Sequence, residues 1–327
     1  MAFLLNKFLL QKLIGLLRLA RPANIVTAFS DIGAGIAIAY FGVLQPLVAQ
    51  HPVSRITAFV SGAWGSNIFI YTLILMLATL GLYGGGVVLN DVFDAELDAV
   101  ERPERPIPSG LISKSLAAAW GVGLLLFGVV CAGLVHWPLF FSTSFFLALA
   151  TAVAAVLYDA WGKHQNIFGP INMGLCRGLN LLLGMSIFPQ VIAQYWFLAL
   201  VPVVYIAAIT MISRGEVHGG KKNTMYGAVF LYVLVVASIL VISFFNDTAL
   251  FTLPFVLLFA VMIFPPLAKA VAQPSGPKIG KAVKAGVLSL ILMNAAWAAA
   301  FGAPVAALCM LLLLPLSMGL AKAFAVT

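Results

Sequence analysis

The amino-acid sequence predicts an all-α bundle of helices that crosses a membrane nine or ten times. Of its 327 residues, 63% are hydrophobic and only 9% are charged, whereas about 25% of the residues in a soluble domain are charged. Apolar runs close to the roughly 20 residues that span a bilayer recur along the whole chain. These runs are too long and too continuous for barrel strands, so the spans must be helices. We therefore expect one transmembrane domain, residues 1–327.

Ten apolar segments are the candidate spans, and charged or Pro-, Gly- and Asn-containing stretches separate them. In order, they cover residues 22–45, 67–92, 115–135, 139–158, 167–189, 193–212, 226–245, 249–268, 282–301 and 304–321. A charged inner loop follows the second segment and another follows the sixth, with four spans between them. Because repeated units are common in such bundles, we expect two four-helix units around a central cavity.

The first twenty residues differ from a signal peptide. Lys7 and Lys12 interrupt their apolar run, and no small-residue cleavage site follows. We expect residues 1–20 to form an amphipathic helix that lies on the inner membrane surface.

Lys and Arg lie mainly on one side of the predicted membrane. With the N-terminus inside, the inner segments hold fifteen of the eighteen basic residues. An excess of Lys and Arg is typical of cytoplasmic loops. We therefore expect the N-terminus and the polar loops on the cytoplasmic side of an integral, multi-pass protein. The formal charge of +8 reports this topology and a possible anionic ligand, and we infer no nucleic-acid site from it.

The segment from Asn90 to Arg105, NDVFDAELDAVERPER, holds six of the ten acidic residues of the chain. If the second span continues as a helix past Asn90, then Asn90, Asp94 and Asp98 lie on one face, with Asp91 beside Asp94. We call these four residues the acidic column. Mg²⁺ typically takes one or two carboxylates and completes its octahedron with water and phosphate oxygens. The acidic column therefore predicts a Mg²⁺ site that suits a diphosphate ligand.

A solvated acidic loop is the simpler interpretation of such a charge run. Three observations favour a metal site: the helical period of the carboxylates, their place at the inner membrane edge, and the cations in the ERPERPIPSG that follows. Glu96, Glu101 and Glu104 fall off the acidic column, and we interpret these three residues as solvated.

Several motifs resemble those of the UbiA superfamily of intramembrane prenyltransferases. NDVFDAELD matches the N-D-x-x-D-x-x-x-D motif of that family, and RPERPIPSG is similar to the continuation of its loop. RPANIVTAFSDIGAG (21–35) resembles the opening of the first span, and YDAWGKHQNIFGPINMGLCRGLNLLLG (158–184) resembles the Tyr/Lys element and the fifth helix. GEVHGGKKNT (215–224) resembles the second acidic loop.

The resemblance implies an enzyme that binds an isoprenyl diphosphate through Mg²⁺ held by two acidic loops. Carried over by position, the metal ligands are Asn90, Asp91, Asp94, Asp98 and Glu216. The residues expected to bind the prenyl diphosphate are Asn24, Arg102, Lys163, Arg177, Arg214 and Lys221.

The second loop departs from the pattern of the family. Glu216 stands at the later position of the usual D-x-x-x-D spacing, and Ile212 stands at the earlier one. Three alternatives follow. Glu216 with water suffices for a second Mg²⁺, or Arg214 and the lysines of this loop take over part of the charge balance, or the chemistry differs. We expect diphosphate binding to be retained.

Asp31, Asp94 and Tyr158 are the candidate catalytic residues. Asp31 lies inside the first span, where an ionisable side chain indicates function by default, and we expect it to orient or deprotonate the acceptor. A hydrogen bond to a neighbouring helix is the alternative. Tyr158 and Tyr83 lie near the inner ends of spans and suit a dry pocket that stabilises an allylic cation. Interfacial or core packing is the alternative for these aromatic residues.

The function predicted from these features is Mg²⁺-dependent transfer of an isoprenyl group from a prenyl diphosphate to a small aromatic or other lipid-precursor acceptor within the lipid bilayer. A non-catalytic transporter or carrier of an anionic amphiphile is the alternative, and the second loop with its single carboxylate favours it. A structural membrane subunit comes third, because it would not need the acidic column.

Overall fold

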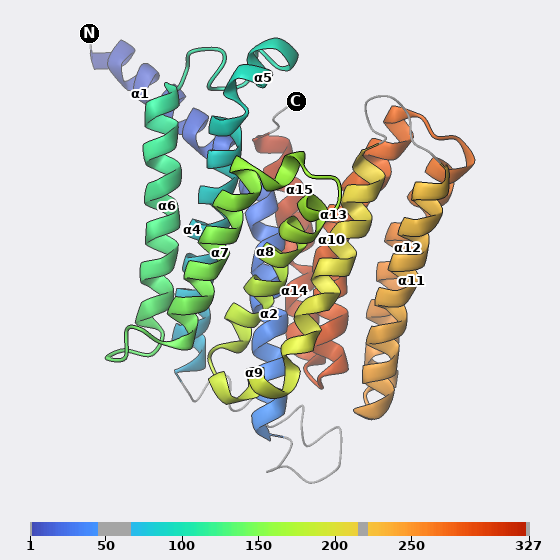
Figure 1. Ribbon diagram of the computed structural model, residues 1–327. Helices are drawn as coiled ribbons and strands as arrows, with labels where there is room; N and C mark the ends of the chain where they lie inside the picture. The colour runs from blue at the N-terminus through green and yellow to red at the C-terminus, as the bar shows by residue number, and fades with distance from the viewer. Residues whose placement is uncertain (1, 45–66, 215–221, 325–327) are drawn as a thin grey trace.

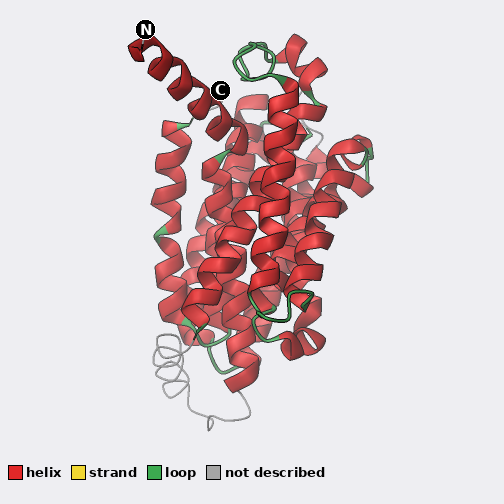
Figure 2. Cartoon of the chain, turned by 90° about the vertical axis from the view of Figure 1, so that its left-hand side faces the viewer, coloured by secondary structure: helices red, strands yellow, loops and turns green. Residues whose placement is uncertain are grey.

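The computed structural model describes residues 2–44, 67–214 and 222–324, and all the secondary structure in these ranges is helical (Figure 2). The α-helices are α1 (Ala2–Ala20), α2 (Pro22–Leu44), α4 (Ile68–Phe93), α5 (Ala95–Glu101), α6 (Lys114–Leu134), α7 (Thr143–Ala160), α8 (Phe168–Met185), α9 (Pro189–Tyr195), α10 (Leu200–Ser213), α11 (Lys222–Phe245), α12 (Ala249–Ala272), α13 (Gly276–Ala300), α14 (Pro304–Leu311) and α15 (Leu313–Ala323). Short 3-10 turns cover Gly162–His164 and Trp196–Ala199.

Nine helical segments in the described ranges are long and apolar enough to cross a membrane. A further helix, α8, is 18 residues long and runs through the bundle beside α2, α7 and α10 (Figure 1). Its Asn172, Arg177 and Asn180 lower its hydropathy, and it is not one of the nine. The prediction of an all-helical bundle with nine or ten spans is confirmed.

The bundle is built around α2 and α8, which pack against each other near its centre (Figure 1). Helices α4, α6 and α7 pack together on one side of this pair, and α10 to α13 form the other side. In chain order, α2 with α4, α6 and α7 corresponds to the first expected four-helix unit, and α8 with α10, α11 and α12 corresponds to the second. Helix α13 and the α14–α15 segment follow at the C-terminal end. Helix α2 also packs against α13, so it joins the two sides.

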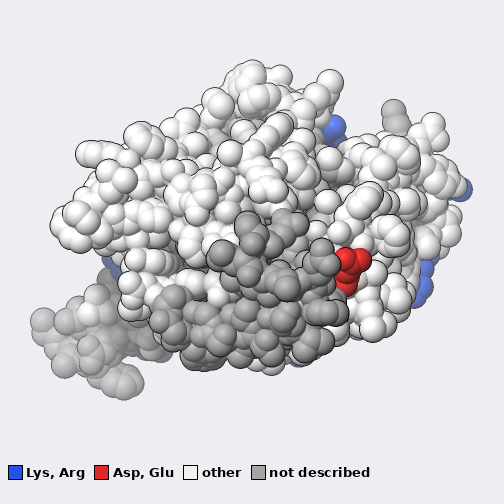
Figure 3. Space-filling view, turned by 90° about the horizontal axis from the view of Figure 1, so that it is seen from below, with Lys and Arg blue, Asp and Glu red and all other residues white. Residues whose placement is uncertain are grey.

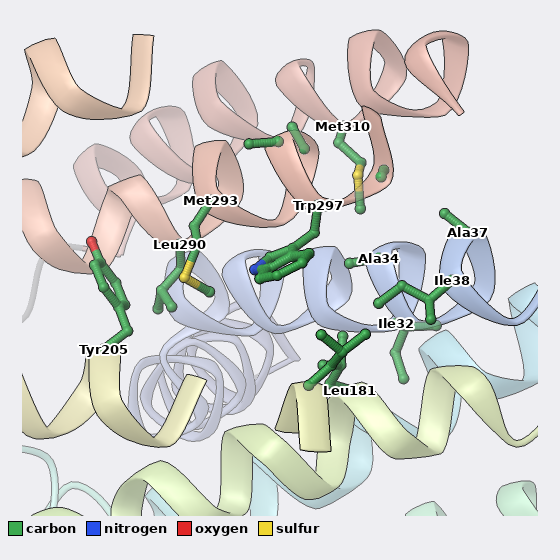
Figure 4. Packing of buried hydrophobic residues seen from close by; sticks show 14 of the residues in the cluster. Ile32, Ala34, Ala37, Ile38, Leu181, Tyr205, Leu290, Met293, Trp297 and Met310 are labelled. Atoms are coloured by element: carbon green, nitrogen blue, oxygen red, sulfur yellow. The ribbon is translucent and has the colours of Figure 1, made fainter. Parts of the chain in front are cut away.

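Close backbone contacts hold the central helices together. A Cβ atom added to Gly35 of α2 would lie 2.2 Å from the carbonyl oxygen of Leu181 in α8. Small residues allow helices to approach this closely in membranes, where van der Waals contact drives association. Trp297 of α13 is almost fully buried and is directed toward Ala34 and Leu181 (Figure 4). The core therefore fixes α2 against both α8 and α13.

Several predicted boundaries were wrong. The fourth span begins at Thr143 rather than at 139, because His136 to Ser142 form a connecting loop that contains Pro138. The sixth predicted span is divided into α9, a 3-10 turn and α10, and the last span is divided at Leu312. Hydropathy alone detects neither break, since Pro189–Ser213 and Pro304–Ala323 are each apolar enough on average to be one span.

The two ends of the bundle differ in charge. Helix α1, α5 and the C-terminal end of α15 lie at one end, where the basic interhelical segments are also found (Figure 1). Seen from the opposite end, the described residues show few charged side chains (Figure 3). Helix α1 forms as expected and extends away from the bundle (Figure 2). Its position on a membrane surface remains a prediction.

Candidate active site

A cavity of about 300 Å³ lies between α2, α4, α7, α8, α10 and α13. Its polar lining residues are Arg21, Asn24, Asn90, Thr151, Tyr158, Asp159, Cys176, Arg177 and Asn180. Its other lining residues are Leu82, Tyr83, Gly86, Val87, Ala155, Met173, Ile206, Val287 and Leu290. Arg21, Asn90 and Asp159 lie where their helices end, at the end of the bundle that carries α5. The cavity therefore has a polar mouth, and its interior is apolar except for Thr151, Arg177 and Asn180.

The acidic column lies at the junction of α4 and α5. Helix α4 ends at Phe93 and α5 begins at Ala95, with Asp94 between them at φ −87° and ψ 1°. The Asp94 N–H donates to the Asn90 carbonyl at 3.0 Å, and the Asp98 N–H donates to the Asp94 carbonyl at 2.8 Å. Helical hydrogen bonds therefore continue past Asn90, as the sequence predicts, with a local distortion at Asp94.

Two arginines hold Asp91 and Asp98. Arg21 Nη2 lies 2.6 Å from Asp91 Oδ1, and Arg105 Nη1 lies 3.3 Å from the same oxygen and 2.6 Å from Asp98 Oδ2. Arg21 has a φ of 49°, which is unusual for a residue other than glycine, and Pro22 begins α2 directly after it. This conformation at the α1–α2 junction allows Arg21 both to line the cavity and to pair with Asp91.

Asp94 pairs with the lysine that the sequence predicts for the diphosphate site. Lys163 Nζ lies 2.6 Å from Asp94 Oδ1 and 5.9 Å from the centre of the Phe93 ring. The Asp94 side chain is 23% exposed, so it is the most accessible carboxylate of the acidic column. A charge-assisted contact of this length at a partly exposed position can be exchanged for a phosphate ligand.

Asn90 of the acidic column contacts a carboxylate from another helix. Its Nδ2 donates to Asp159 Oδ1 of α7 at 2.9 Å, and both residues line the cavity. Asp159 is 4% exposed, and its second oxygen, Oδ2, has no hydrogen-bond partner in the described residues. Thr151, Ala155 and Asp159 follow one another at four-residue intervals and all line the cavity. The predicted fourth span ended at 158, which left Asp159 in a loop and hid this pattern.

Asp31 lies in a buried network rather than at the cavity surface. Arg177 Nη1 donates to Asp31 Oδ2 at 2.8 Å, Asn180 Nδ2 donates to the same oxygen at 3.1 Å, and Asn294 Nδ2 donates to Oδ1 at 2.7 Å. Arg177 Nη2 also donates to Thr27 Oγ1 at 2.7 Å. We call these five residues the central network. Asp31 is fully buried, so it reaches the cavity through Arg177 and Asn180, which line it.

Other predicted site residues lie elsewhere. Arg102 is exposed at the end of α5, and Arg105, which the sequence analysis did not select, is the arginine that contacts the carboxylates. Arg214 is also exposed and donates to the backbone carbonyl of Asn166. Glu216 and Lys221 lie outside the described residues. The structure thus brings Asn24, Asn90, Tyr158 and Arg177 to the cavity, with Asp94 and Lys163 beside its mouth.

Within the described ranges, no group of three His, Cys, Asp or Glu side chains is arranged to hold a metal ion alone. A protein cage of that kind is not required for Mg²⁺, since one or two carboxylates suffice when phosphate and water supply the other ligands. Asp94 is partly exposed, Asn90 lines the cavity, and Asp159 has a buried carboxylate oxygen without a partner. This oxygen-rich donor set fits a Mg²⁺ ion that binds together with a diphosphate.

Comparisons with known proteins identify the family of the chain. The model of the UbiA prenyltransferase family matches residues 53–264. Digeranylgeranylglyceryl phosphate synthase from Methanothrix thermoacetophila is 38% identical over 125 residues, which cover 38% of this chain and 45% of the relative. The same enzyme from Methanoregula boonei is 33% identical over 175 residues, covering 53% of this chain and 58% of the relative. The matched parts thus span about half the length of these curated relatives.

The fold is also similar to that of a solved structure. A structure reported for digeranylgeranylglyceryl phosphate synthase in membranes superposes with a TM-score of 0.59 at 22% sequence identity, covering 89% of this chain and 98% of the other. This likeness supports the helical arrangement, and the family model matches 53–264, which includes α4, the acidic column and part of α12. The chain belongs to the UbiA prenyltransferase family.

Proposed function

We propose that this protein transfers an isoprenyl group from a prenyl diphosphate to a small lipid-precursor acceptor, with Mg²⁺ bound at the acidic column. The observation that carries the proposal is the cavity, which has cationic and amide side chains at its mouth and apolar side chains inside the bundle. A molecule with a strongly anionic head and a long apolar tail matches both parts. Membership of the family and the names of the relatives support the same activity.

The reaction exchanges one bond of the allylic carbon for another. The bond to the diphosphate oxygen breaks, the carbon bonds to the acceptor, and the acceptor loses a proton. Negative charge grows on the diphosphate as its bond breaks, so Arg21 and Lys163 stabilise the transition state more than the ground state. Mg²⁺ bound to the diphosphate would add to this stabilisation as a Lewis acid.

The protein must also keep water away from the allylic cation. The apolar side chains of Leu82, Ile206 and Leu290 line the interior and exclude water. The Arg177 guanidinium lies over the Tyr83 ring, 5.4 Å from the ring centre. Tyr158 is a second aromatic residue that lines the cavity. An aromatic face next to a developing carbocation is stabilising by the cation–π effect.

The mouth of the cavity should face the cytoplasm. The acidic column, Lys163 and the basic interhelical segments all lie at the end of the bundle that carries α5, and the described part of the opposite end shows few charges (Figure 3). Lys and Arg accumulate on the cytoplasmic side of membrane proteins. A water-soluble diphosphate head would then enter from that side, while the prenyl tail remains in lipid.

The test is prenyl transfer by the purified protein in lipid nanodiscs with Mg²⁺. We would supply geranyl, farnesyl and geranylgeranyl diphosphate, each with geranylgeranylglyceryl phosphate or with an aromatic acid, and measure diphosphate release and prenylated product by mass spectrometry. The expected result is product with at least one pair and a large loss with Asp94→Asn. Absence of product together with saturable binding of the prenyl diphosphate would favour the carrier function instead.

A further inference from the structure

Asp159 is the only carboxylate among the described residues that line the cavity. Within the described ranges, Asp159 forms no ion pair. The cations near the cavity pair with other carboxylates: Arg21 with Asp91, Lys163 with Asp94 and Arg177 with Asp31. One of its oxygens accepts from Asn90, and the other is buried without a partner. A buried, unpaired carboxylate oxygen is costly and therefore calls for a ligand or a role.

An ionised Asp159 conflicts with the proposed substrate unless a cation lies between them. A diphosphate in the cavity mouth would bring several negative charges close to this carboxylate, and like charges repel strongly where water is excluded. The cations that line the cavity do not neutralise Asp159, since Arg21 pairs with Asp91 and Arg177 pairs with Asp31. A divalent cation shared by the carboxylate and the phosphate oxygens removes the repulsion.

We infer that Asp159 is a metal-binding residue, through its Oδ2, for the Mg²⁺ that accompanies the diphosphate. Asn90 holds the carboxylate by its other oxygen, which fixes the direction of the free one. This assignment rests on the proposed function. It also accounts for Ile212, a buried apolar residue. Ile212 stands at the position where the family pattern has the first carboxylate of the second loop. In this chain α7 supplies a carboxylate that the second loop lacks.

The first test measures metal binding without turnover. Mn²⁺ would be titrated by electron paramagnetic resonance into the protein saturated with geranylgeranyl S-thiolodiphosphate, an analogue that resists ionisation. We expect wild type to bind Mn²⁺ only with the analogue, and Asp159→Asn to weaken that binding by about tenfold or more. Glu96→Gln, at an exposed carboxylate outside the site, serves as the matched control and should behave as wild type.

The outcomes separate this inference from the proposed function. If wild type binds no Mn²⁺ with the analogue, the proposed Mg²⁺-dependent function fails. If wild type binds Mn²⁺ and Asp159→Asn binds it equally well, the function stands and the assignment of Asp159 is overturned. A variant that loses turnover but keeps its Mn²⁺ affinity assigns Asp159 to proton removal from the acceptor, which also overturns the inference.

A second variant tests whether the side chain at position 159 contacts the metal, and it controls for a folding defect. Asp159→Cys replaces the carboxylate by a thiolate, which prefers soft metals such as Cd²⁺ to Mg²⁺. We expect Cd²⁺, but not Mg²⁺, to restore binding of the analogue to this variant. Wild type, which already contains Cys131, Cys176 and Cys309, should show no such preference. A folded Asp159→Cys protein that responds to neither metal, or equally to both, contradicts the assignment.

Discussion

Carboxylate and cation pairs occur in two very different settings in this bundle. In the central network, Asp31 is fully buried, and both of its oxygens accept hydrogen bonds from other helices. At the cavity mouth, Asp94 is 23% exposed and contacts Lys163 through one oxygen. The first pair has no position left for a ligand, whereas the second is open to exchange. Similar chemistry therefore supports structure in one place and, under the proposed function, binding in the other.

The difference follows from the helices that contribute to each pair. The central network joins α2, α8 and α13, which form the core of the bundle. The Asp94–Lys163 pair joins the end of α4 to the segment after α7, where the two side chains are 23% and 12% exposed. A buried ion pair is destabilised severely when one partner is removed, while a partly exposed pair contributes little to stability. The comparison thus predicts opposite responses of stability and activity.

The largest effect on stability is expected for Asp31→Ala. This change leaves the Arg177 guanidinium buried without its counter-charge, and removal of one partner of such a pair costs about 3–5 kcal/mol. Thermal unfolding followed by circular dichroism in detergent measures the loss. The double variant Asp31→Leu with Arg177→Met removes both charges and should recover much of the stability without restoring turnover. An Asp31→Ala protein as stable as wild type would remove the distinction between the two settings.

Asp94→Asn should lower turnover strongly and stability only slightly. Turnover is expected to fall by about 10²–10³-fold, the usual cost of losing one group that stabilises developing charge. The melting temperature should change much less than in Asp31→Ala, because Asp94 lies at the edge of the fold. Rates of diphosphate release at saturating prenyl diphosphate, compared with the melting curve of the same preparation, provide the measurement. Unchanged turnover would show that the mouth of the cavity is not the reaction site.

The helical fold could be predicted from the sequence because hydropathy alone requires it. Each apolar run of sufficient length became a helix, and α8 was found despite Arg177 because its flanks are apolar. Hydropathy did not predict the break between α9 and α10, because Pro189–Ser213 is apolar enough on average to be a single span.

The site was predictable where it follows a helical period and not where it depends on tertiary contact. The four-residue helical spacing placed Asn90 and Asp94 together on the acidic column. The resemblance to the UbiA superfamily indicated Lys163. No spacing rule distinguishes Arg102 from Arg105, because both precede a proline after α5, and only the fold brings Arg105 to Asp98. Asp159 had a usable signal, its four-residue spacing from Ala155 and Thr151, but a span boundary set two residues too early concealed it.

Gly184→Ala should weaken the central network by an intermediate amount. A Cβ atom there would lie 2.5 Å from the backbone oxygen of Ile32, so α2 and α8 must move apart, and such overpacking costs about 1–3 kcal/mol. Because the Asp31–Arg177 pair bridges the same two helices, turnover should fall together with stability. Gly123→Ala on α6 is the matched control, since no atom lies within 4 Å of its added Cβ. Equal melting temperatures for the two variants would contradict this packing argument.

The smallest effect is expected at the exposed pair of Glu96 and Lys114, which extends the comparison to a third setting. Lys114 Nζ lies 3.9 Å from Glu96 Oε1, and the Glu96 side chain is 96% exposed. Water and salt screen such a pair, so it contributes little to stability and presents no fixed oxygen to a metal. Glu96→Gln should leave both the melting temperature and turnover within experimental error of wild type. A clear loss of turnover would instead mean that the acidic segment acts as a diffuse negative surface, and that helical period does not separate its ligands from its solvated residues.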